Sequence, residues 1–471
     1  MQGKITEVTM EENKMGVMPI KKLVITMSLP MMISMLVQAL YNVVDSLFVA
    51  RVSEDALTAV SLAFSVQNLM ISFISGTCVG INALLSRYLG AKNHEGANRV
   101  AVNGLFVVVI TYIFFLLFGL FGTRAFFHML TKDKGVVDAG VEYLSIISIA
   151  SIGMTLQMTL ERLLQSTGKT FYTMITQGLG AIINIILDPI FIFGYLGMPA
   201  MGVAGAAVAT IFGQIIAAGL ALYFNLKKND EIKLSFKGFR PQGNVIGKIY
   251  QVAIPSIIMM SVGSILNFFM NKILLIFTKT ATTVFGVYFK VQSFFFMPVF
   301  GLNNGMVPIV AYNYGARNPK RIKETVKFSV ILAVAIMLFG LAVMQFFPRE
   351  ILLMFNASED MMIIGISALR IISLSFLFAG FCIIAGSVFQ ALGNGVYSLI
   401  VSIARQLVVL LPAAYLLAKV FGDPSNPYSV NAVWWSFPIA EIMSVIVSAI
   451  LLIRIFNKKI RSLNDDVVDN I

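Results

Sequence analysis

Long apolar runs, separated by short stretches that carry most of the charged residues, follow one another along the whole chain. A helix needs about 20 apolar residues to cross a bilayer, since each residue adds about 1.5 Å to a path of about 30 Å. The pattern predicts twelve membrane-spanning helices, near residues 24–50, 56–85, 100–122, 139–161, 170–195, 202–225, 248–277, 281–309, 326–347, 364–389, 396–421 and 431–456.

The second half of the sequence repeats landmarks of the first half at a constant offset. The segment Tyr88-Leu89-Gly90-Ala91-Lys92-Asn93 recurs 225 residues later as Asn313-Tyr314-Gly315-Ala316-Arg317-Asn318. The same offset relates Pro30 to Pro255, Gly80 to Gly305, Gln165 to Gln390 and Gly168 to Gly393. Six spans per copy is an even number, so both copies enter the membrane in the same direction. We therefore expect two parallel six-helix repeats that rock about a shared central site.

The one long polar stretch between the repeats divides the chain into parts. We expect a cytoplasmic N-terminal tail (1–23), an N-lobe of six spans (24–225), a cytoplasmic linker (226–247), a C-lobe of six spans (248–456) and a cytoplasmic C-terminal tail (457–471). In each repeated loop, Gly90 and Gly315 are expected to cap the preceding helix in the left-handed conformation.

The composition supports a membrane protein, and the distribution of basic residues indicates its orientation in the membrane. Hydrophobic residues make up 58% of the chain and charged residues 12%, whereas soluble domains carry roughly 25% charge. The net charge of +12 does not indicate a nucleic-acid partner, because basic residues gather on cytoplasmic loops. With the N-terminus inside, 24 basic residues lie on the cytoplasmic side and 8 on the other. We expect a multi-pass membrane protein with both termini in the cytoplasm.

A polar face interrupts the first predicted span. Gln38, Asn42 and Asp45 are spaced i, i+4 and i+7, and Tyr41 lies one turn from Asp45, so these side chains share a helix face. A charged side chain at the bilayer centre costs at least about 2.5–3.5 kcal/mol, and it is therefore a functional candidate by default. Such a face must line a cavity or another helix. The alternative is that Asp45 caps the helix or meets water outside.

A second acid lies late in the fifth predicted span. Asn184 precedes Asp188 by one turn, and Pro189 follows it. Proline removes a backbone donor, which would loosen the span where a carboxylate can be rehydrated. Two neighbouring carboxyls, with Asp45 as the other, can hold one proton or one sodium ion between them. The alternative is an Asp-Pro turn at the edge of the span.

The two Gly-Ala-Lys/Arg-Asn loops, the Tyr41-Asn42-Val43-Val44-Asp45 stretch and the Asn184-Ile185-Ile186-Leu187-Asp188-Pro189 stretch carry a family resemblance. In combination they resemble the multidrug and toxic compound extrusion (MATE) family, over almost the whole chain. The resemblance is to the prokaryotic branch that keeps its acids in the N-lobe. It implies an all-α integral membrane protein, with twelve transmembrane helices in a V-shaped two-lobe transporter.

The resemblance also implies a function. Family members are secondary antiporters that expel bulky, often cationic organic compounds in exchange for H⁺ or Na⁺, by alternating access of rocking lobes. The matching residues form a polar cluster that binds the coupling ion; here they are Pro30, Tyr41, Asp45, Asn184 and Asp188, with Thr210 as a further member. We expect Pro30 and Pro189 to allow conformational change. No cofactor is implied, and the only metal considered is Na⁺ at this cluster.

The resemblance sets the partners and the place of action as well. We expect small organic substrates, contact with lipid, and action as a monomer in the inner membrane of a bacterial cell.

The acids are not duplicated in the second repeat. At the repeat offset Asp45 corresponds to Met270 and Asp188 to Ala413. The C-lobe instead contains Lys290 in the middle of a span and Glu441 in the last span. These two residues would either pair with each other inside the lobe, which is a structural role, or contact substrate. Arg405 is interpreted as an anchor near the inner end of its span.

One other function remains as an alternative. A flippase for lipid-linked precursors or polysaccharides belongs to the same superfamily, and Lys290 would suit its anionic head groups. We do not expect a membrane-embedded enzyme. The chain has two histidines, His94 and His128, outside the centres of the spans, which excludes a His-Glu-x-x-His zinc site.

Overall fold

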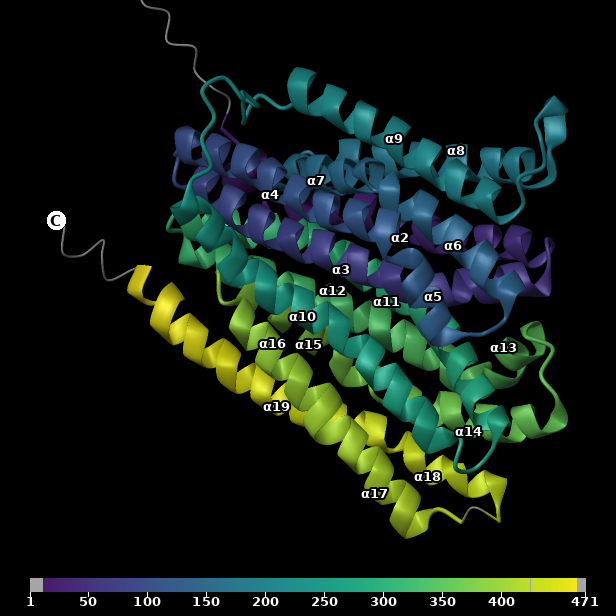
Figure 1. The fold of residues 1–471 in the computed structure, drawn as a ribbon. Helices are drawn as coiled ribbons and strands as arrows, with labels where there is room; N and C mark the ends of the chain where they lie inside the picture. Colours follow the sequence, from purple (N-terminus) through teal and green to yellow (C-terminus); the bar gives the residue numbers. More distant parts are fainter. Residues whose placement is uncertain (1–11, 424, 464–471) are drawn as a thin grey trace, which may run out of the picture.

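The computed structural model describes residues 12–423 and 425–463, without the side chains of Ser46, Ala50, Glu54, Asp55 and Leu57. The regular secondary structure of this part of the chain is all helical (Figure 1). Parts of both predicted tails, residues 1–11 and 464–471, lie outside it. Eight uninterrupted helices are long and apolar enough to cross a membrane: α2 (Ile20–Ala50), α3 (Glu54–Gly90), α4 (His94–Phe121), α8 (Thr170–Phe193), α9 (Val203–Lys227), α10 (Gly243–Leu274), α11 (Lys279–Gly315) and α12 (Pro319–Phe346).

The remaining spans are composite. One joins α16 (Gly395–Ile403), the π-helix η2 (Ala404–Leu410) and α17 (Leu411–Phe421), and another joins η3 (Pro427–Val430), α18 (Asn431–Trp434), α19 (Ser436–Ile455) and η4 (Phe456–Ile460). Two more are bent pairs: α6 (Lys134–Ile149) with α7 (Ile152–Ser166), and α14 (Glu359–Ser373) with α15 (Phe376–Ala391). Short helices complete this part of the chain: α1 (Lys14–Val17), α5 (Thr123–Leu130), η1 (Tyr195–Gly197) and α13 (Pro348–Met354). With each bent pair counted as one span, the described residues hold the twelve spans that the sequence predicts.

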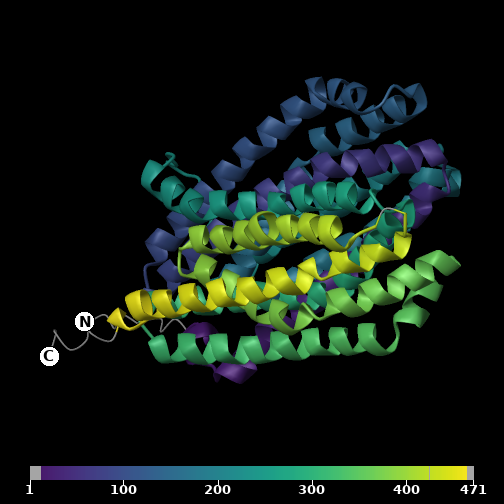
Figure 2. The same ribbon diagram turned by 90° about the horizontal axis from the view of Figure 1, so that it is seen from below.

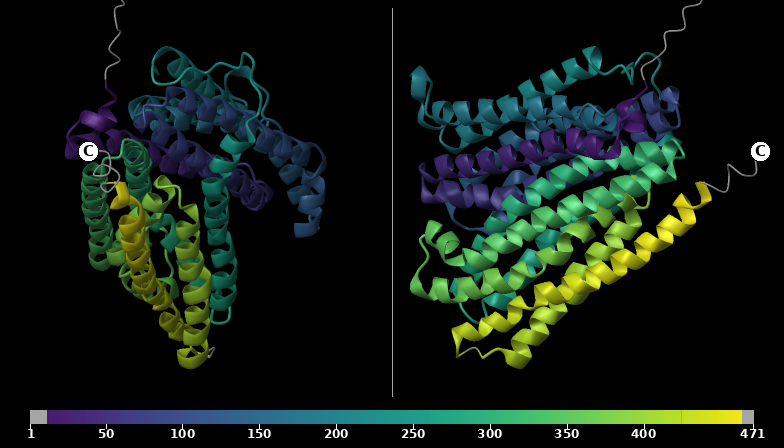
Figure 3. Two further views of the ribbon diagram at one scale, coloured as in Figure 1. Left: turned by 90° about the vertical axis from the view of Figure 1, so that its left-hand side faces the viewer. Right: turned by 180° about the vertical axis from the view of Figure 1, so that it is seen from behind.

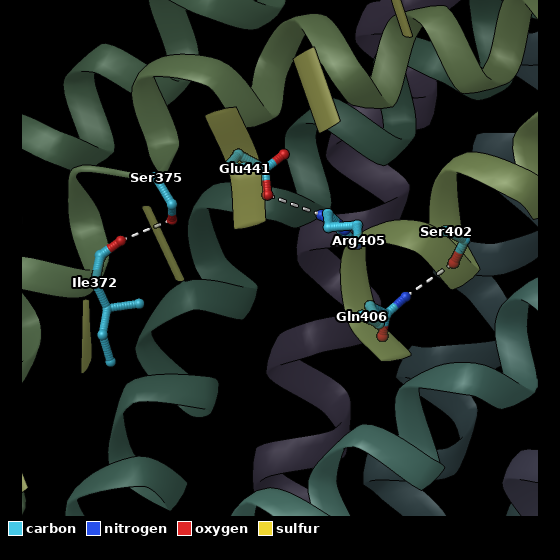
Figure 4. Close-up of polar contacts among 6 residues, drawn as sticks. All are labelled: Ile372, Ser375, Ser402, Arg405, Gln406 and Glu441. Atoms are coloured by element: carbon cyan, nitrogen blue, oxygen red, sulfur yellow. Dashed lines mark hydrogen bonds and ion pairs between the residues drawn. The ribbon is translucent and has the colours of Figure 1, made fainter. Parts of the chain in front are cut away.

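The two bends occur at matching places in the repeats and share a local feature. The first pair bends by 44° and the second by 49°. At the first bend the Ser151 hydroxyl donates to the carbonyl of Ser148 at 2.8 Å, and at the second the Ser375 hydroxyl donates to the carbonyl of Ile372 at 2.7 Å (Figure 4). A serine that bonds back to the preceding turn competes with the helical ladder and bends it. The apolar pattern alone did not reveal these bends.

We refer to α2–α9 as the first half and to α10–η4 as the second half. Their helices form two groups, coloured purple to teal and teal to yellow in Figure 3. The halves meet through α2 against α11 and α3 against α10. A Cβ added to Gly76 would lie 2.8 Å from the backbone nitrogen of Ile257, and one added to Gly301 would lie 2.5 Å from Cα of Met32. At the offset of 225 these two contacts are equivalent, so the repeat in the sequence is also a repeat in the packing.

The repeated loops differ from expectation in one detail. The left-handed residues are Lys92, with φ of 54°, and Arg317, with φ of 52°, whereas Gly90 and Gly315 are the last helical residues of α3 and α11. The prediction that these glycines supply the left-handed cap was wrong. They are glycines because another backbone lies against each of them.

The hydrophobic core shows where the halves join and where they part. One cluster of buried residues extends through the second half and includes Leu23, Ile81 and Leu85 of the first half. A separate cluster, with members such as Phe127 and Tyr143, lies entirely in the first half. The halves therefore share a core near the ends of α3 and α11 and have separate cores toward the opposite end, as in a V-shaped molecule.

Both ends of the described chain lie at the joined end of the bundle (Figure 2). The carbonyl of Met15 accepts a hydrogen bond from Asn313, and Lys459 lies over the ring of Tyr314, so α1 and η4 both contact the end of α11. Large apolar side chains remain exposed on the outer faces, for example Phe339 at 66% and Ile453 at 63%. A surface of this kind is suited to lipid.

Candidate functional site

Three helices of the first half bring the predicted polar residues together. Helix α8 packs against both α2 and α9. The α8–α9 crossing is close because both helices have a glycine there: a Cβ on Gly213 would lie 2.7 Å from the carbonyl oxygen of Gly180. Small residues at a crossing allow backbones to approach in a membrane. This approach places Thr210 of α9 beside Asn184 of α8.

A chain of hydrogen bonds links the three helices. The Asn184 amide is assigned with its oxygen toward Thr210, because the opposite orientation would place its N–H groups against the backbone N–H of Thr210. Its nitrogen then donates to Oδ2 of Asp188 at 2.9 Å, and its oxygen accepts from Oγ1 and N of Thr210 at 3.0 and 2.9 Å. The Thr210 hydroxyl lies 3.4 Å from the Tyr41 hydroxyl, which is left as the donor of that pair. The chain runs from Tyr41 to the carboxyl of Asp188.

The two acids lie within electrostatic reach of each other. Asp188 is fully buried, and the charge of Asp45 acts on it and on Tyr143. Asp45 is half-buried on α2, and Gln67 donates to the Tyr143 hydroxyl at 3.2 Å. Within the described residues, Oδ1 of each acid is buried and has no hydrogen-bond partner. Each carboxyl therefore retains an oxygen that can take a proton or contribute to cation binding.

Both prolines of the prediction lie inside continuous helices. Pro30 is in the first third of α2, which runs from Ile20 to Ala50. Pro189 follows Asp188, and α8 continues to Phe193 before Gly194 ends it with φ of 77°. Asp188 is therefore not part of a turn at the edge of the span. Each proline leaves a gap in the backbone ladder of its helix.

The remaining predicted polar residues lie elsewhere. Gln38 and Asn42 are exposed on α2, and Lys290 is exposed on α11. Glu441 is only 5% exposed and pairs with Arg405, whose Nη1 lies 3.2 Å from Oε2 (Figure 4). Pairing of Glu441 with Lys290 was one of our two expectations; the structure contradicts it, and Arg405 is not a surface anchor. The π-helix that carries Arg405 is a feature the apolar pattern could not reveal.

Sequence reasoning missed a further buried acid. Glu161 of α7 is 2% exposed and accepts hydrogen bonds from Thr176 at 2.8 Å, Gln177 at 2.8 Å and Gln157 at 3.1 Å. The neighbouring Arg162 donates to Oδ1 of Asn304 in the other half at 3.1 Å. The fourth predicted span, 139–161, stopped one residue before Arg162. The available signal was Gln157, four residues before Glu161 on the same helix face.

The described residues contain no group of three or more His, Cys, Asp or Glu side chains arranged to hold a metal ion. Asp45 and Asp188 are two acids only, and any further oxygen ligands for Na⁺ would come from neutral groups such as Asn184, Thr210 and Tyr41. This donor set is chemically suited to a proton or to a weakly held monovalent cation, and it lacks the soft ligands of transition metals.

Comparison with known proteins gives the family. The sequence model of the MatE family matches residues 30–190 and 255–416, once in each repeat. The chain belongs to the MATE family. It is similar to the multidrug export protein MepA of Staphylococcus haemolyticus, with 26% identity over 440 residues that cover 92% of this chain and 93% of that protein. MepA of Staphylococcus saprophyticus is 25% identical over 428 residues, 90% of this chain and 92% of that protein.

Solved MATE structures have the same fold. A multidrug resistance MATE transporter of the MOP superfamily, solved in an outward-facing conformation, superposes with a TM-score of 0.89 at 26% identity, covering 98% of this chain and 100% of that one. A MOP superfamily transporter from Pyrococcus furiosus, described as having a binding pocket of reverse polarity, gives the same TM-score and identity, with 97% and 100% covered. The predicted fold class, two six-helix repeats in a V-shaped transporter, is confirmed.

Proposed function

We propose that this MATE protein exports bulky, often cationic organic compounds in exchange for H⁺, or for Na⁺, with Asp45 and Asp188 as the coupling acids. The relatives named as multidrug export proteins support the export function. Small organic compounds and the lipid bilayer are the partners, and the chain acts as a monomer. No cofactor takes part.

The hydrogen-bond chain that ends at Asp188 is the observation that carries this proposal. Asn184 presents one N–H to Oδ2 of Asp188, while Oδ1 has no donor within the described residues. A buried carboxylate is costly unless its charge is compensated. Asp188 would therefore hold a proton or a cation at Oδ1 whenever the site is closed to water. Asp45, within electrostatic reach, would share that ion.

The ion would select between two arrangements of the halves. Protonation of Asp45 and Asp188 from outside, or binding of a cation between them, would lower the negative charge of the pair, bend α2 at Pro30 and release the drug. Loss of the ion to the cytoplasm would restore drug binding. Pro189, beside Asp188, would absorb part of the change in α8. A ligand shifts such an equilibrium only by its difference in affinity for the two states. Here that difference would arise because a carboxylate that has lost its ion is costly to bury.

The membrane placement follows from the charge distribution. We propose that the joined end of the bundle, where α1 and η4 lie, faces the cytoplasm of a bacterial cell, so that both termini are cytoplasmic and the chain crosses the inner membrane. The N-lobe, linker and C-lobe would be 24–225, 226–247 and 248–456. In this orientation the packed end is the inner end, and the V opens outward.

Ethidium efflux from proteoliposomes, with proton and sodium gradients imposed separately, tests the proposal. A proton gradient, or a sodium gradient in its place, is expected to drive efflux by the wild type and not by the Asp45→Asn, Asp188→Asn double variant. Efflux by the double variant at the wild-type rate would contradict the roles given to the two acids.

A flippase of the same superfamily is the second candidate. The exposed Lys290 favours it, since an ammonium group suits anionic head groups. The reverse polarity reported for the pocket of a MATE-like relative shows that this fold accepts other charge patterns. Translocation of a fluorescent lipid-linked phosphate in liposomes, without ethidium transport, would favour this candidate over the antiporter.

A further inference from the structure

The joined end of the bundle is crossed by two segments that are not membrane spans. One, the N-terminal strap, comprises residues 13–18 and leads into α2. The other, the linker strap, comprises residues 228–242 and leads into α10. Each is fixed by side-chain hydrogen bonds to its backbone, which is how irregular segments are held in place.

The N-terminal strap is bound to the second half. Met15 is fully buried, and its carbonyl accepts hydrogen bonds from Asn313 of α11 at 3.0 Å and from Arg321 of α12 at 3.0 Å. Arg321 also donates to the carbonyl of Met18 at 2.8 Å and to Oδ1 of Asn313 at 3.1 Å. Gly16 lies against the ring of Tyr312, which a Cβ would approach to 3.2 Å. One guanidinium thus holds two carbonyls of a segment that belongs to the first half.

The same strap is tied back to the first half and to the linker. The Asn13 amide donates to the carbonyl of Thr167, between α7 and α8, at 3.2 Å. It also donates to Oε1 of Glu231 in the linker strap at 2.7 Å. Asn13 is therefore the point where the two straps meet.

The linker strap is bound to the first half. Asn98 of α4 accepts from the backbone nitrogen of Lys233 at 2.7 Å, and Asn103 of α4 accepts from that of Gln242 at 2.9 Å. The rings of Phe106 and Phe239 pack with centroids 5.6 Å apart. The segment that leads into the second half is thus held by the third span of the first half.

Each strap crosses from one half of the molecule to the other. Each one leads into one half and docks on the other, on α12 and α4, which are equivalent in the repeat. The duplication alone does not produce the α12 contact: the repeat counterpart of Arg321 is Gly96, and that of Asn313 is Tyr88. Side chains specific to the second half have been placed where the N-terminal strap crosses it.

We propose that the N-terminal strap is a latch that holds the joined end closed, and that it must leave Arg321 before the halves can separate at that end. This proposal rests on one element of the proposed function, which is that the two halves change their packing during transport. The strap spans the α7–α8 loop, the linker and the start of α12, so separation of the halves cannot leave all of its bonds intact. Release would transfer Met15 from the core to the surface.

Spin labels on the two halves, without drug or ion gradient, test the latch. Labels at cysteines replacing Lys227 and Lys320, both exposed at the joined end, report its opening, and labels replacing Lys132 and Arg349 report the opposite end. The background lacks Cys78 and Cys382. Loss of one ordinary hydrogen bond shifts a two-state population about fivefold. Asn13→Ala and Arg321→Ala are each expected to raise the population with a long distance between the labels at 227 and 320 by about fivefold or more. The distance between the labels at 132 and 349 should become shorter.

Glu12→Ala is the matched control, because Glu12 meets Lys92 at 3.9 Å with both side chains largely exposed, and it should leave both distributions unchanged. If Arg321→Ala does not fold, Arg321→Lys, which keeps the charge but cannot bridge both carbonyls, replaces it. Distributions of Asn13→Ala and of the Arg321 variant that match the wild type would overturn the latch. Since no drug or ion gradient is applied, this result is independent of whether Asp45 and Asp188 couple transport.

Discussion

Gly90 of α3 and Gly315 of α11 are equivalent in the repeat, and each lies against the backbone of the other's helix. A Cβ on Gly90 would be 1.8 Å from the carbonyl oxygen of Tyr312, and a Cβ on Gly315 would be 2.0 Å from that of Arg87. Arg87 and Tyr312 are themselves repeat equivalents, so this is one contact made twice. The guanidinium of Arg87 also lies 4.8 Å from the ring centre of Tyr314. The two halves are thus joined at a symmetric crossing of their repeated loops.

Alanine at either glycine should separate the halves at this crossing. Backbone cannot move aside as a flexible side chain can, so Gly90→Ala and Gly315→Ala are each expected to cost about 1–3 kcal/mol or more of stability. Gly219→Ala, where a Cβ would meet nothing within 4 Å, is the control. Melting temperatures in detergent measure the effect. Equal melting of the Gly90 and Gly219 variants would show that the crossing is not tightly packed in solution.

The Asn184 bridge predicts a graded loss of coupling. Asn184→Ala removes the N–H that faces Asp188 and the oxygen that faces Thr210, while leaving both acids in place. Gradient-driven efflux should fall about 10-fold, which corresponds to about 1.4 kcal/mol for a charge-assisted hydrogen bond. Thr210→Val should give a smaller loss, because Asn184 retains the backbone N–H of Thr210. Normal efflux by Asn184→Ala would mean that Asp188 does not depend on this amide.

The Arg405–Glu441 pair predicts non-additive stability. Removing one partner leaves a buried charge uncompensated, at a cost of about 3–5 kcal/mol, whereas replacing both with apolar residues costs much less. Arg405→Met and Glu441→Met should therefore each lower the melting temperature more than the double variant does. The double-mutant cycle gives the coupling energy. Additive effects would mean that the pair contributes no net interaction.

The Glu161 cluster is expected to stabilise the helix pair without coupling ions. Glu161→Ala leaves Gln177 and Gln157 without their acceptor, while Thr176 can still donate to the carbonyl of Thr173 at 2.9 Å. Each donor stranded away from water costs about 1–3 kcal/mol. The variant should melt well below the wild type, while the exposed Glu142→Ala should not. The dependence of efflux on the imposed gradient should be unchanged for the folded fraction. A changed ion dependence would instead place Glu161 among the coupling residues.

The sequence predicted what depends on apolar periodicity and on the repeat. The twelve spans, the parallel repeats and the positions of Asp45 and Asp188 all follow from residue types at fixed spacing. Features that depend on a partner far away in the sequence were not predictable. The role of Gly90 is set by the carbonyl of Tyr312, which lies on another helix. The partner of Glu441 is Arg405, which lies in a π-helix within an apolar stretch of sequence. Glu161 was missed because its acceptor role depends on Thr176 and Gln177 of the next helix.

The central claim is that Asp45 and Asp188 tie drug export to an ion. The most direct measurement is ethidium efflux from proteoliposomes by the wild type and the Asp45→Asn, Asp188→Asn double variant, with ethidium binding measured on the same preparations. The account predicts that the double variant still binds ethidium but gains no efflux from a proton or a sodium gradient. Gradient-driven efflux at the wild-type rate in a variant without either acid would contradict it.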